Sequence, residues 1–271
     1  MRPIFWLAPI LLVVVPSEQF ITDLSLIGTD LFKRIPDLPE LGDGEKREFY
    51  YYEQTIVVRD YSDAERNRMI RCEIVEVNTE EQVAEAFWKL ASWELPGHNV
   101  TMKEMMFFMN DCDVLDDDNN INVFNEKNEE ETAKASDAEE EDSTNIVSSR
   151  NFFHGIFPGT KWCGFGDIAE RYHDLGKFRN TDRCCRAHDL CPIKVLSRKE
   201  RYCLKNLAIY TKSHCMCDEA FYICLKKNNG LPDKAVGGVF FNKFTAPNCI
   251  EGLPEFPEEP MKFVPAKRKW L

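Results

Sequence analysis

The chain has 271 residues and eleven cysteines, and this length suffices for one or two domains. Its formal net charge of −12 averages two unlike regions. Residues 1–150 carry 14 Lys and Arg against 33 Asp and Glu, which gives −19, whereas residues 151–271 carry 20 against 13, which gives +7. The overall acidity therefore describes neither region, and the cationic second region favours anionic surfaces such as lipid headgroups.

Residues 1–17 have the pattern of a secretory signal peptide. Arg2 precedes an apolar run from Ile4 to Val15, which is too short to cross a bilayer comfortably. No later segment is apolar enough to span a membrane, so we expect a secreted, extracellular protein with no transmembrane anchor. In an oxidising compartment the cysteines are expected to form disulfides, and nine of the eleven lie after residue 160.

Residues 18–112 predict a small α+β or partly disordered N-terminal region. Residues 50–58 (YYYEQTIVV) are aromatic and β-branched, and residues 72–77 (CEIVEV) alternate, so each predicts a short strand. Residues 79–93 open with the capping-box pattern TEEQ and predict a helix. Asn99 begins an N-V-T glycosylation sequon, which has meaning in an exported chain.

Residues 113–150 are acidic and poor in aromatic side chains, and they cannot bury enough apolar surface to fold. We predict a linker here. It ends at Arg150, a candidate processing site, although an arginine in an ordinary linker is the alternative interpretation. On the processing hypothesis, residues 18–150 are an acidic pro-region whose release restores the attraction of the cationic region to anionic membranes.

The stretch CCRAHDLC, from Cys184 to Cys191, permits a zinc site, a disulfide scaffold or a catalytic helix. A second stretch, CMCDEAFYICL, carries Cys217 and Cys224 at the same spacing of seven. Seven residues are two helical turns, about 10.5 Å, so each pair lies on one stripe of its helix. If the two helices are antiparallel, Cys184 can meet Cys224 while Cys191 meets Cys217.

In that register Asp218 lies about 3 Å along the helix axis from His188. A carboxylate can then fix the tautomer of the imidazole, as a general base requires, and a purely structural contact is the alternative. The upstream loop PGTKWCGFGD (158–167) favours chemistry. Its glycines suit a loop that wraps a hard cation, and Asp189 can supply the negative charge.

Four segments together resemble secreted phospholipase A2 of the group III, bee-venom-like type: PGTKWCGFG, GKFRNTDRCCRAHDLCP, YTKSHCMCDEAFYICL and the VGGVFFNKF region that leads to Cys249. The resemblance covers about residues 152–250. It implies a mainly α, disulfide-rich phospholipase A2 domain over residues 151–271, in which two antiparallel cysteine-bridged helices accompany a calcium loop and a small β-hairpin. The implied bridges are Cys163–Cys185, Cys184–Cys224, Cys191–Cys217 and Cys215–Cys249.

The resemblance also implies a site, a cofactor and a function. His188 would be the general base for water and Asp218 its partner. The ligands of Ca²⁺ would be the carboxylate of Asp189 and the backbone carbonyls of Trp162, Gly164 and Gly166. The implied enzyme is a secreted calcium-dependent phospholipase that hydrolyses the sn-2 ester of glycerophospholipids to a free fatty acid and a lysophospholipid. Its expected partner is a phospholipid membrane surface, with anionic lipids favoured, and not nucleic acid.

Two other functions stay open: a catalytically weak phospholipase-like binding protein or toxin-type ligand, and a zinc module built from Cys and His. The sequence also departs from the family pattern. Phe240 stands where the family typically has a tyrosine whose hydroxyl supports the aspartate. Cys203 leaves an odd cysteine, which would allow the N-terminal region to stay attached through a bridge to Cys72 or Cys112.

Overall fold

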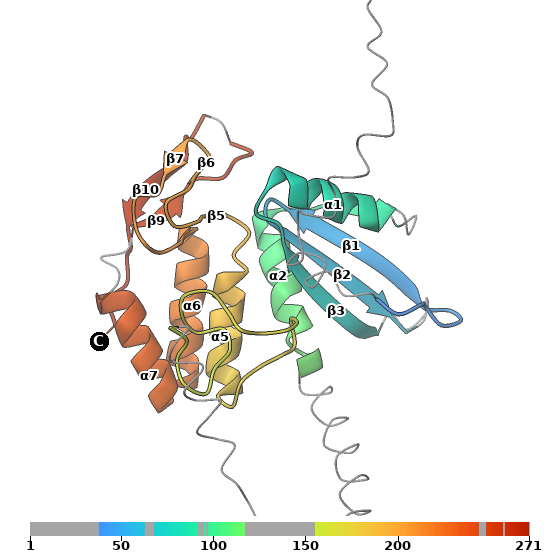
Figure 1. The fold of residues 1–271 in the computed structure, drawn as a ribbon, viewed down its shortest axis with the longest axis horizontal. Helices are drawn as coiled ribbons and strands as arrows, with labels where there is room; N and C mark the ends of the chain where they lie inside the picture. The colour runs from blue at the N-terminus through green and yellow to red at the C-terminus, as the bar shows by residue number, and fades with distance from the viewer. Residues whose placement is uncertain are drawn as a thin grey trace, which may run out of the picture.

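The computed structural model describes residues 38–62, 68–91, 95, 97–116, 155–243, 248–256 and 258–270. The predicted signal peptide, Arg150 and all but the first four residues of the predicted linker lie outside these ranges. The described chain forms two modules that lie side by side (Figure 1). We call residues 38–116 the N-terminal module and residues 155–270 the C-terminal module. No helix within these ranges is both long and apolar enough to cross a bilayer.

The N-terminal module is built on a four-stranded sheet in the order β3-β2-β1-β4. Its members are β1 (Lys46–Tyr52), β2 (Thr55–Tyr61), β3 (Met69–Glu76) and β4 (Gly97–Asn99). The first three are antiparallel neighbours, and β4 runs parallel to β1. The strand predicted over residues 72–77 falls in β3, so the alternating pattern was a correct signal there.

The single strand predicted over residues 50–58 is wrong, because this segment is a hairpin. Tyr52 pairs with Thr55, so Glu53 and Gln54 form a two-residue turn between β1 and β2. Glu53 adopts a positive φ of 48°, which such turns usually assign to glycine or asparagine. Neither residue occurs here, and the apolar residues on both sides concealed the turn.

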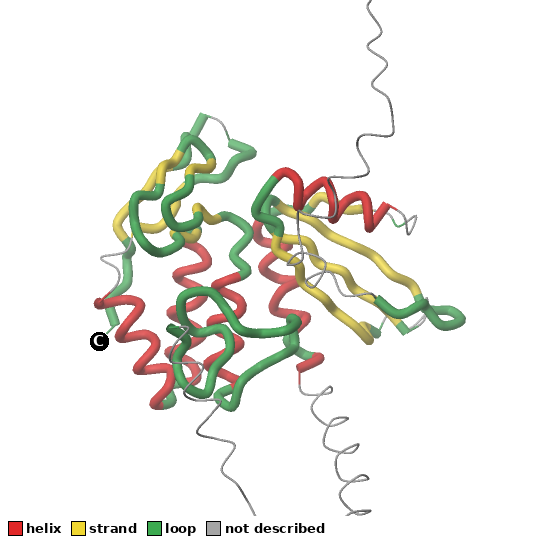
Figure 2. Tube along the Cα trace, viewed as in Figure 1, coloured by secondary structure: helices red, strands yellow, loops and turns green. Residues whose placement is uncertain are grey.

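Two helices cover the sheet (Figure 2). α1 (Glu80–Ala91) begins at the predicted capping box, in which the Thr79 hydroxyl accepts a backbone amide at 3.2 Å. α2 (Met102–Cys112) begins with a second capping box at Thr101, the last residue of the sequon. Asn99 itself is exposed. The sequence therefore predicted the start of α1 correctly, and the sequon lies where a glycan would have access.

The two faces of the sheet belong to different cores. Side chains alternate along a strand, so Ile56 packs with α1 in a small separate cluster while Val57 packs on the side of α2. The α2 side does not end at the module boundary. Met105 of α2 belongs to the same buried cluster as Leu190 and Phe221 of the C-terminal module. The two modules therefore share one hydrophobic core.

The C-terminal module combines helices with short strand pairs (Figure 1). The helices are α5 (Arg179–Asp189), α6 (Cys215–Asn228), α7 (Leu231–Gly238) and the π-helical turn η1 (Val239–Lys243). The strand pairs are β5 (Lys194–Val195) with β8 (Lys212–Ser213), β6 (Glu200–Arg201) with β7 (Leu204–Lys205), and β9 (Asn248–Glu251) with β10 (Lys262–Pro265). The expected disulfide-rich helical domain with a small hairpin is present.

All eleven cysteines lie within the described residues, and ten of them are paired. The four bridges of the C-terminal module are those implied by the family resemblance: Cys163–Cys185, Cys184–Cys224, Cys191–Cys217 and Cys215–Cys249. The second and third of these fix α5 and α6 as antiparallel neighbours, as their equal spacings predicted. A fifth bridge joins β3 to α2 inside the N-terminal module.

Two sequence-based hypotheses are wrong. Cys72 pairs with Cys112, with Cα atoms 5.5 Å apart, so neither can bridge to Cys203, which is a free and exposed thiol. The zinc module also fails, because every cysteine of CCRAHDLC is bound in a disulfide. Within the described ranges, no cluster of three or more His, Cys, Asp or Glu side chains could hold a metal.

The predicted linker begins too early. Residues 113–116 are folded at the end of α2, and Asp116 is buried at the contact with the C-terminal module. Its carboxylate accepts from the fully buried guanidinium of Arg186 at 2.8 Å and from that of Arg183 at 2.7 Å. A third contact, at 2.7 Å, joins it to the ring of His173. The acidic composition concealed this role, because the partners lie in the other module.

Candidate active site

His188 and Asp218 meet between two disulfides. His188 lies near the C-terminal end of α5, and Asp218 lies in the first turn of α6. The bridges on either side, Cys184–Cys224 and Cys191–Cys217, hold Cα atoms 5.7 and 5.9 Å apart. In this register His188 Nε2 lies 2.8 Å from Asp218 Oδ1. The contact expected from the cysteine spacing is present.

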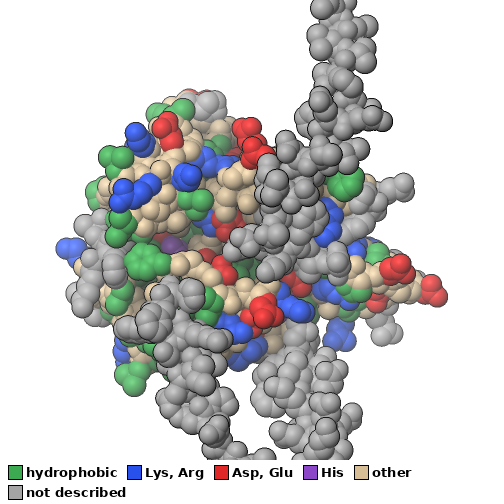
Figure 3. Space-filling model, in the orientation of Figure 1, with side chains coloured by type: hydrophobic (Ala, Val, Ile, Leu, Met, Phe, Trp, Pro, Cys, Tyr) green, Lys and Arg blue, Asp and Glu red, His purple; other side chains and the backbone are tan. Residues whose placement is uncertain are grey.

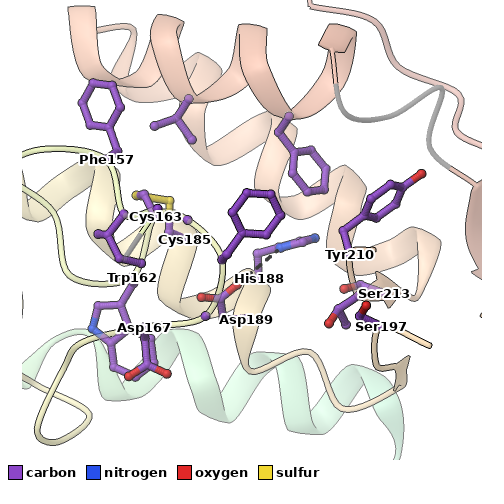
Figure 4. A pocket seen from close by; sticks show the side chains of 18 of the residues that line it. Phe157, Trp162, Cys163, Asp167, Cys185, His188, Asp189, Ser197, Tyr210 and Ser213 are labelled. Atoms are coloured by element: carbon purple, nitrogen blue, oxygen red, sulfur yellow. Dashed lines mark ion pairs between the residues drawn. A yellow bond between two sulfur atoms is a disulfide. The ribbon is translucent and has the colours of Figure 1, made fainter. Parts of the chain in front are cut away.

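The tautomer of His188 follows from this contact. An ionised carboxylate can only accept a hydrogen bond, so Nε2 carries the proton and donates a hydrogen bond to Asp218, and the neutral ring has its lone pair on Nδ1. The ring stacks on Phe221, with centroids 4.7 Å apart, and makes a T-shaped contact with Phe240, with centroids 4.9 Å apart. Nδ1 lies 4.0 Å from Asp189 Oδ1. Figure 4 shows His188 and Asp189 side by side in the pocket.

Asp182 holds the upstream loop against α5, a role that was not predicted from the sequence. Its carboxylate accepts backbone amides from Lys161, Trp162 and Gly176 at 2.8 to 3.0 Å. Burial raises the pKa of this carboxyl, and the three amides oppose that rise. The signal was available, because Asp182 precedes Cys185 by three residues, so both face the loop on one stripe of the helix.

The four expected calcium ligands line the same pocket as His188. These residues are Trp162, Gly164, Gly166 and Asp189, and the cavity has a volume of about 770 Å³. Two glycines are required by the backbone itself. Gly166 has a φ of +79°, and a Cβ on Gly164 would lie 2.4 Å from the carbonyl oxygen of Gly155. The loop therefore has the conformation that its glycines allowed.

Asp189 presents an uncompensated oxygen to this pocket. Its Oδ2 atom is buried, and it has no hydrogen-bond partner among the residues that the structure describes. Burial raises the pKa of Asp189 well above its ordinary value, and the nearby ammonium of Lys194 opposes the rise. A buried carboxylate oxygen and the backbone carbonyls of loop residues that line the same pocket are donors that suit a hard divalent cation. The residues present thus fit Ca²⁺.

The remaining walls of the pocket are mostly apolar, and two lining residues come from the other module. The apolar residues include Ile156, Phe157, Leu196, Ile209, Phe221, Val236, Val239 and Phe240. These two residues are Glu76, at the end of β3, and Asn78, just beyond it. No chemistry was predicted for residues before 150, so neither Glu76 nor Asn78 was expected at the pocket.

Known proteins resemble this part of the chain. Residues 156–252 match the family described as phospholipase A2. Over 90 residues the chain is 47% identical to phospholipase A2 of Xylocopa appendiculata circumvolans. The aligned stretch is 33% of the chain and 49% of that protein. It is 41% identical over 88 residues to phospholipase A2 of Apis mellifera, and this alignment spans 32% of the chain and 53% of that protein.

A human protein is also similar. The chain is 41% identical over 90 residues to the group 3 secretory phospholipase A2 of Homo sapiens, which covers 33% of the chain and 18% of that protein. The chain thus spans about half the length of the two bee proteins and less of the human one. Residues 156–252, about a third of the chain, are therefore a phospholipase A2 domain of the group III, bee-venom-like type.

Proposed function

We propose that this protein is a secreted, calcium-dependent phospholipase A2 that hydrolyses the sn-2 ester of glycerophospholipids to a free fatty acid and a lysophospholipid. One observation carries the proposal. His188 is tied to Asp218 through Nε2, and its Nδ1 lies near Asp189, whose buried Oδ2 has no partner in the described structure. A base and a cation ligand therefore share one pocket.

The chain's residues divide into those that bind the cation and those that move the proton. Ca²⁺, held by Asp189 and the carbonyls of Trp162, Gly164 and Gly166, would supply Lewis-acid stabilisation of the charge that develops on the ester oxygen. The loop that carries these carbonyls is fixed to α5 by Asp182 and by the Cys163–Cys185 bridge. The ligands are thus positioned before the substrate arrives.

His188 performs the proton transfers. Its Nδ1 accepts a proton from the attacking water, and Asp218 stabilises the imidazolium that results. The same Nδ1–H then donates to the departing glycerol oxygen, which releases the lysophospholipid. Phe221 and Phe240 hold the plane of the ring during both steps. Asp218 stays ionised throughout and only orients the ring.

The surface around the pocket suits a lipid interface. Ile209 and Val239 line the pocket and are 59% and 41% exposed, and Phe165 at the rim is 56% exposed. Lys and Arg side chains gather over the strand-pair end of the C-terminal module, which is the upper left of Figure 3. Exposed apolar residues beside a basic surface favour a membrane with anionic lipids as the partner.

Hydrolysis of mixed phosphatidylcholine and phosphatidylglycerol vesicles tests the proposal. We expect His188→Gln to lower fatty acid release by about 10²–10⁴-fold or more, because it removes the general base, while calcium binding persists. Chelation of calcium should abolish release by the unaltered protein. His98→Gln, at an exposed histidine on β4, is the matched control and should release fatty acid normally. Undiminished release by His188→Gln, or release that ignores a chelator, contradicts the proposal.

Phe240 favours one alternative, a catalytically weak binding protein. Its ring lies against His188 without a hydroxyl that could support Asp218. On this alternative the protein would bind vesicles in the presence of calcium, and fatty acid release would be negligible and equal for the unaltered protein and His188→Gln. The same assay therefore separates the two functions.

A further inference from the structure

The N-terminal module binds the backbone immediately after the proposed calcium ligand Asp189. Thr55 donates its hydroxyl to the Leu190 carbonyl at 3.1 Å, and the Gln54 amide donates to the Pro192 carbonyl at 3.1 Å. The side chain of Gln54 then accepts the amide of Lys194 at 3.1 Å. Three contacts from one hairpin turn thus fix the segment that connects Asp189 to β5.

Lys194 is the charged residue of this segment. Its side chain is buried, and its Nζ makes an ion pair with Glu76 Oε1 at 2.8 Å. The same Nζ also donates to the backbone carbonyl of Asp189. Glu76 ends β3 of the N-terminal module, so the ammonium is held between the two modules. It contacts the carbonyl of Asp189, while Oδ2 of the same residue keeps no partner in the described structure.

A buried ammonium without a counter-ion carries a large desolvation cost and turns to the nearest available carboxylate. If Glu76 lost its charge, that carboxylate would be the one on Asp189. The pair of Lys194 and Glu76 is neutral as a unit, which leaves the carboxyl group of Asp189 available to a cation. Without the Glu76 charge, Lys194 and Asp189 would neutralise each other, and the attraction for a divalent ion would fall.

We propose that Glu76 of the N-terminal module is a positioning residue for the calcium site, because it keeps Lys194 from neutralising Asp189. The inference rests on the proposed function, since it takes Asp189 to be a calcium ligand. It makes the N-terminal module part of the enzyme's working structure. A module with this role must stay in place during turnover, which favours retention over release after processing.

Calorimetric titration of the full chain with calcium chloride tests the role of Glu76 without measuring catalysis. We expect Glu76→Gln to weaken calcium binding by about 10–100-fold, as loss of a residue that supports a metal ligand commonly does. The double variant Glu76→Gln with Lys194→Met should recover most of the affinity, because no ammonium then competes for Asp189. A merely structural role for Glu76 predicts no such rescue.

Glu251→Gln is the matched control, because Glu251 pairs with Lys262 at an exposed site and does not line the pocket. It should bind calcium like the unaltered protein, and thermal unfolding of each variant should verify that the fold is retained. Normal affinity in Glu76→Gln, or a double variant as weak as Glu76→Gln alone, would overturn the inference. An unaltered protein that binds no calcium would overturn the proposed function, and this inference would fall with it.

Discussion

The two modules of the molecule are held in different ways. Four disulfides cross-link the C-terminal module, and two of them fix the register of α5 against α6 at His188 and Asp218. No disulfide joins the modules to each other, although all eleven cysteines are described. The N-terminal module is held instead by a shared apolar core and by buried ion pairs. The register of the proposed catalytic residues, His188 and Asp218, is therefore covalently fixed, whereas the position of Glu76 depends on non-covalent contacts.

Three contacts between the modules converge on Asp116, from His173, Arg183 and Arg186. Burial alone would raise the pKa of this carboxyl, but the hydrogen bonds from His173 and Arg186 outweigh burial and hold the pKa well below its ordinary value. Asp116 is thus ionised, and it neutralises a guanidinium with no exposed surface. A buried pair of this kind is strongly sensitive to the loss of one partner.

The largest effect on stability is expected from Asp116→Ala. It leaves the buried Arg186 with only Asp113 as a carboxylate partner, and we expect the free energy of unfolding to fall by about 3–5 kcal/mol. Urea unfolding measures the change. Arg268→Ala, which breaks an exposed pair with Glu219, is the control and should leave the urea midpoint unchanged. Equal midpoints for both variants would show that the buried pair does not hold the modules together.

The lowered pKa of Asp116 predicts how the difference in stability between the unaltered protein and Asp116→Ala depends on pH. A carboxyl with a depressed pKa in the folded state contributes stability that is complete above its unfolded pKa of about 3.9. That contribution is lost as the pH falls toward the folded value. The gap between the unaltered protein and Asp116→Ala should therefore still be present at pH 5 and shrink only below about pH 4. A gap that has already closed at pH 5 would mean that Asp116 is not ionised there.

A smaller loss of stability is expected when a disulfide of the C-terminal module is removed. Replacing Cys184 and Cys224 together by alanine should lower the free energy of unfolding by about 2–4 kcal/mol, because the unfolded chain regains freedom. Removal of the Cys72–Cys112 bridge is a matched control, since both bridges span a sequence separation of 40 residues. We expect similar losses of stability and a larger loss of turnover for the bridge beside His188. Equal turnover in both variants would show that the bridge does not maintain the register of the site.

The smallest effect, on turnover, is expected at Phe240, whose ring lies against His188. Phe240→Tyr should raise turnover modestly, because a hydroxyl that reaches the aspartate adds a hydrogen bond worth about 1.5–3 kcal/mol at most. Vesicle hydrolysis at saturating calcium measures the rate. A lower rate would show that this position, whose ring makes a T-shaped contact with His188, is used here for apolar packing alone.

Much of the site could be predicted because its residues are tied to local patterns. Equal cysteine spacings on two helices leave one antiparallel register, and that register brings His188 to Asp218. The loop glycines likewise signalled their conformation. The rest depends on contacts between distant segments. Glu76 and Lys194 stand in no motif, and nothing local shows that the end of β3 meets the segment after α5. The turn at Glu53 was missed because an unusual residue occupies a positive φ.

Every disulfide closes within its own module, so only the backbone joins the two modules covalently. If the chain is cut at the candidate processing site Arg150, no disulfide crosses the cut. The two pieces would separate on a denaturing gel without any reductant, yet they would migrate together under native conditions through the core that they share. The modules could equally be expressed from two genes and mixed, which would allow a Glu76 variant of one piece to be combined at will with an unaltered catalytic piece.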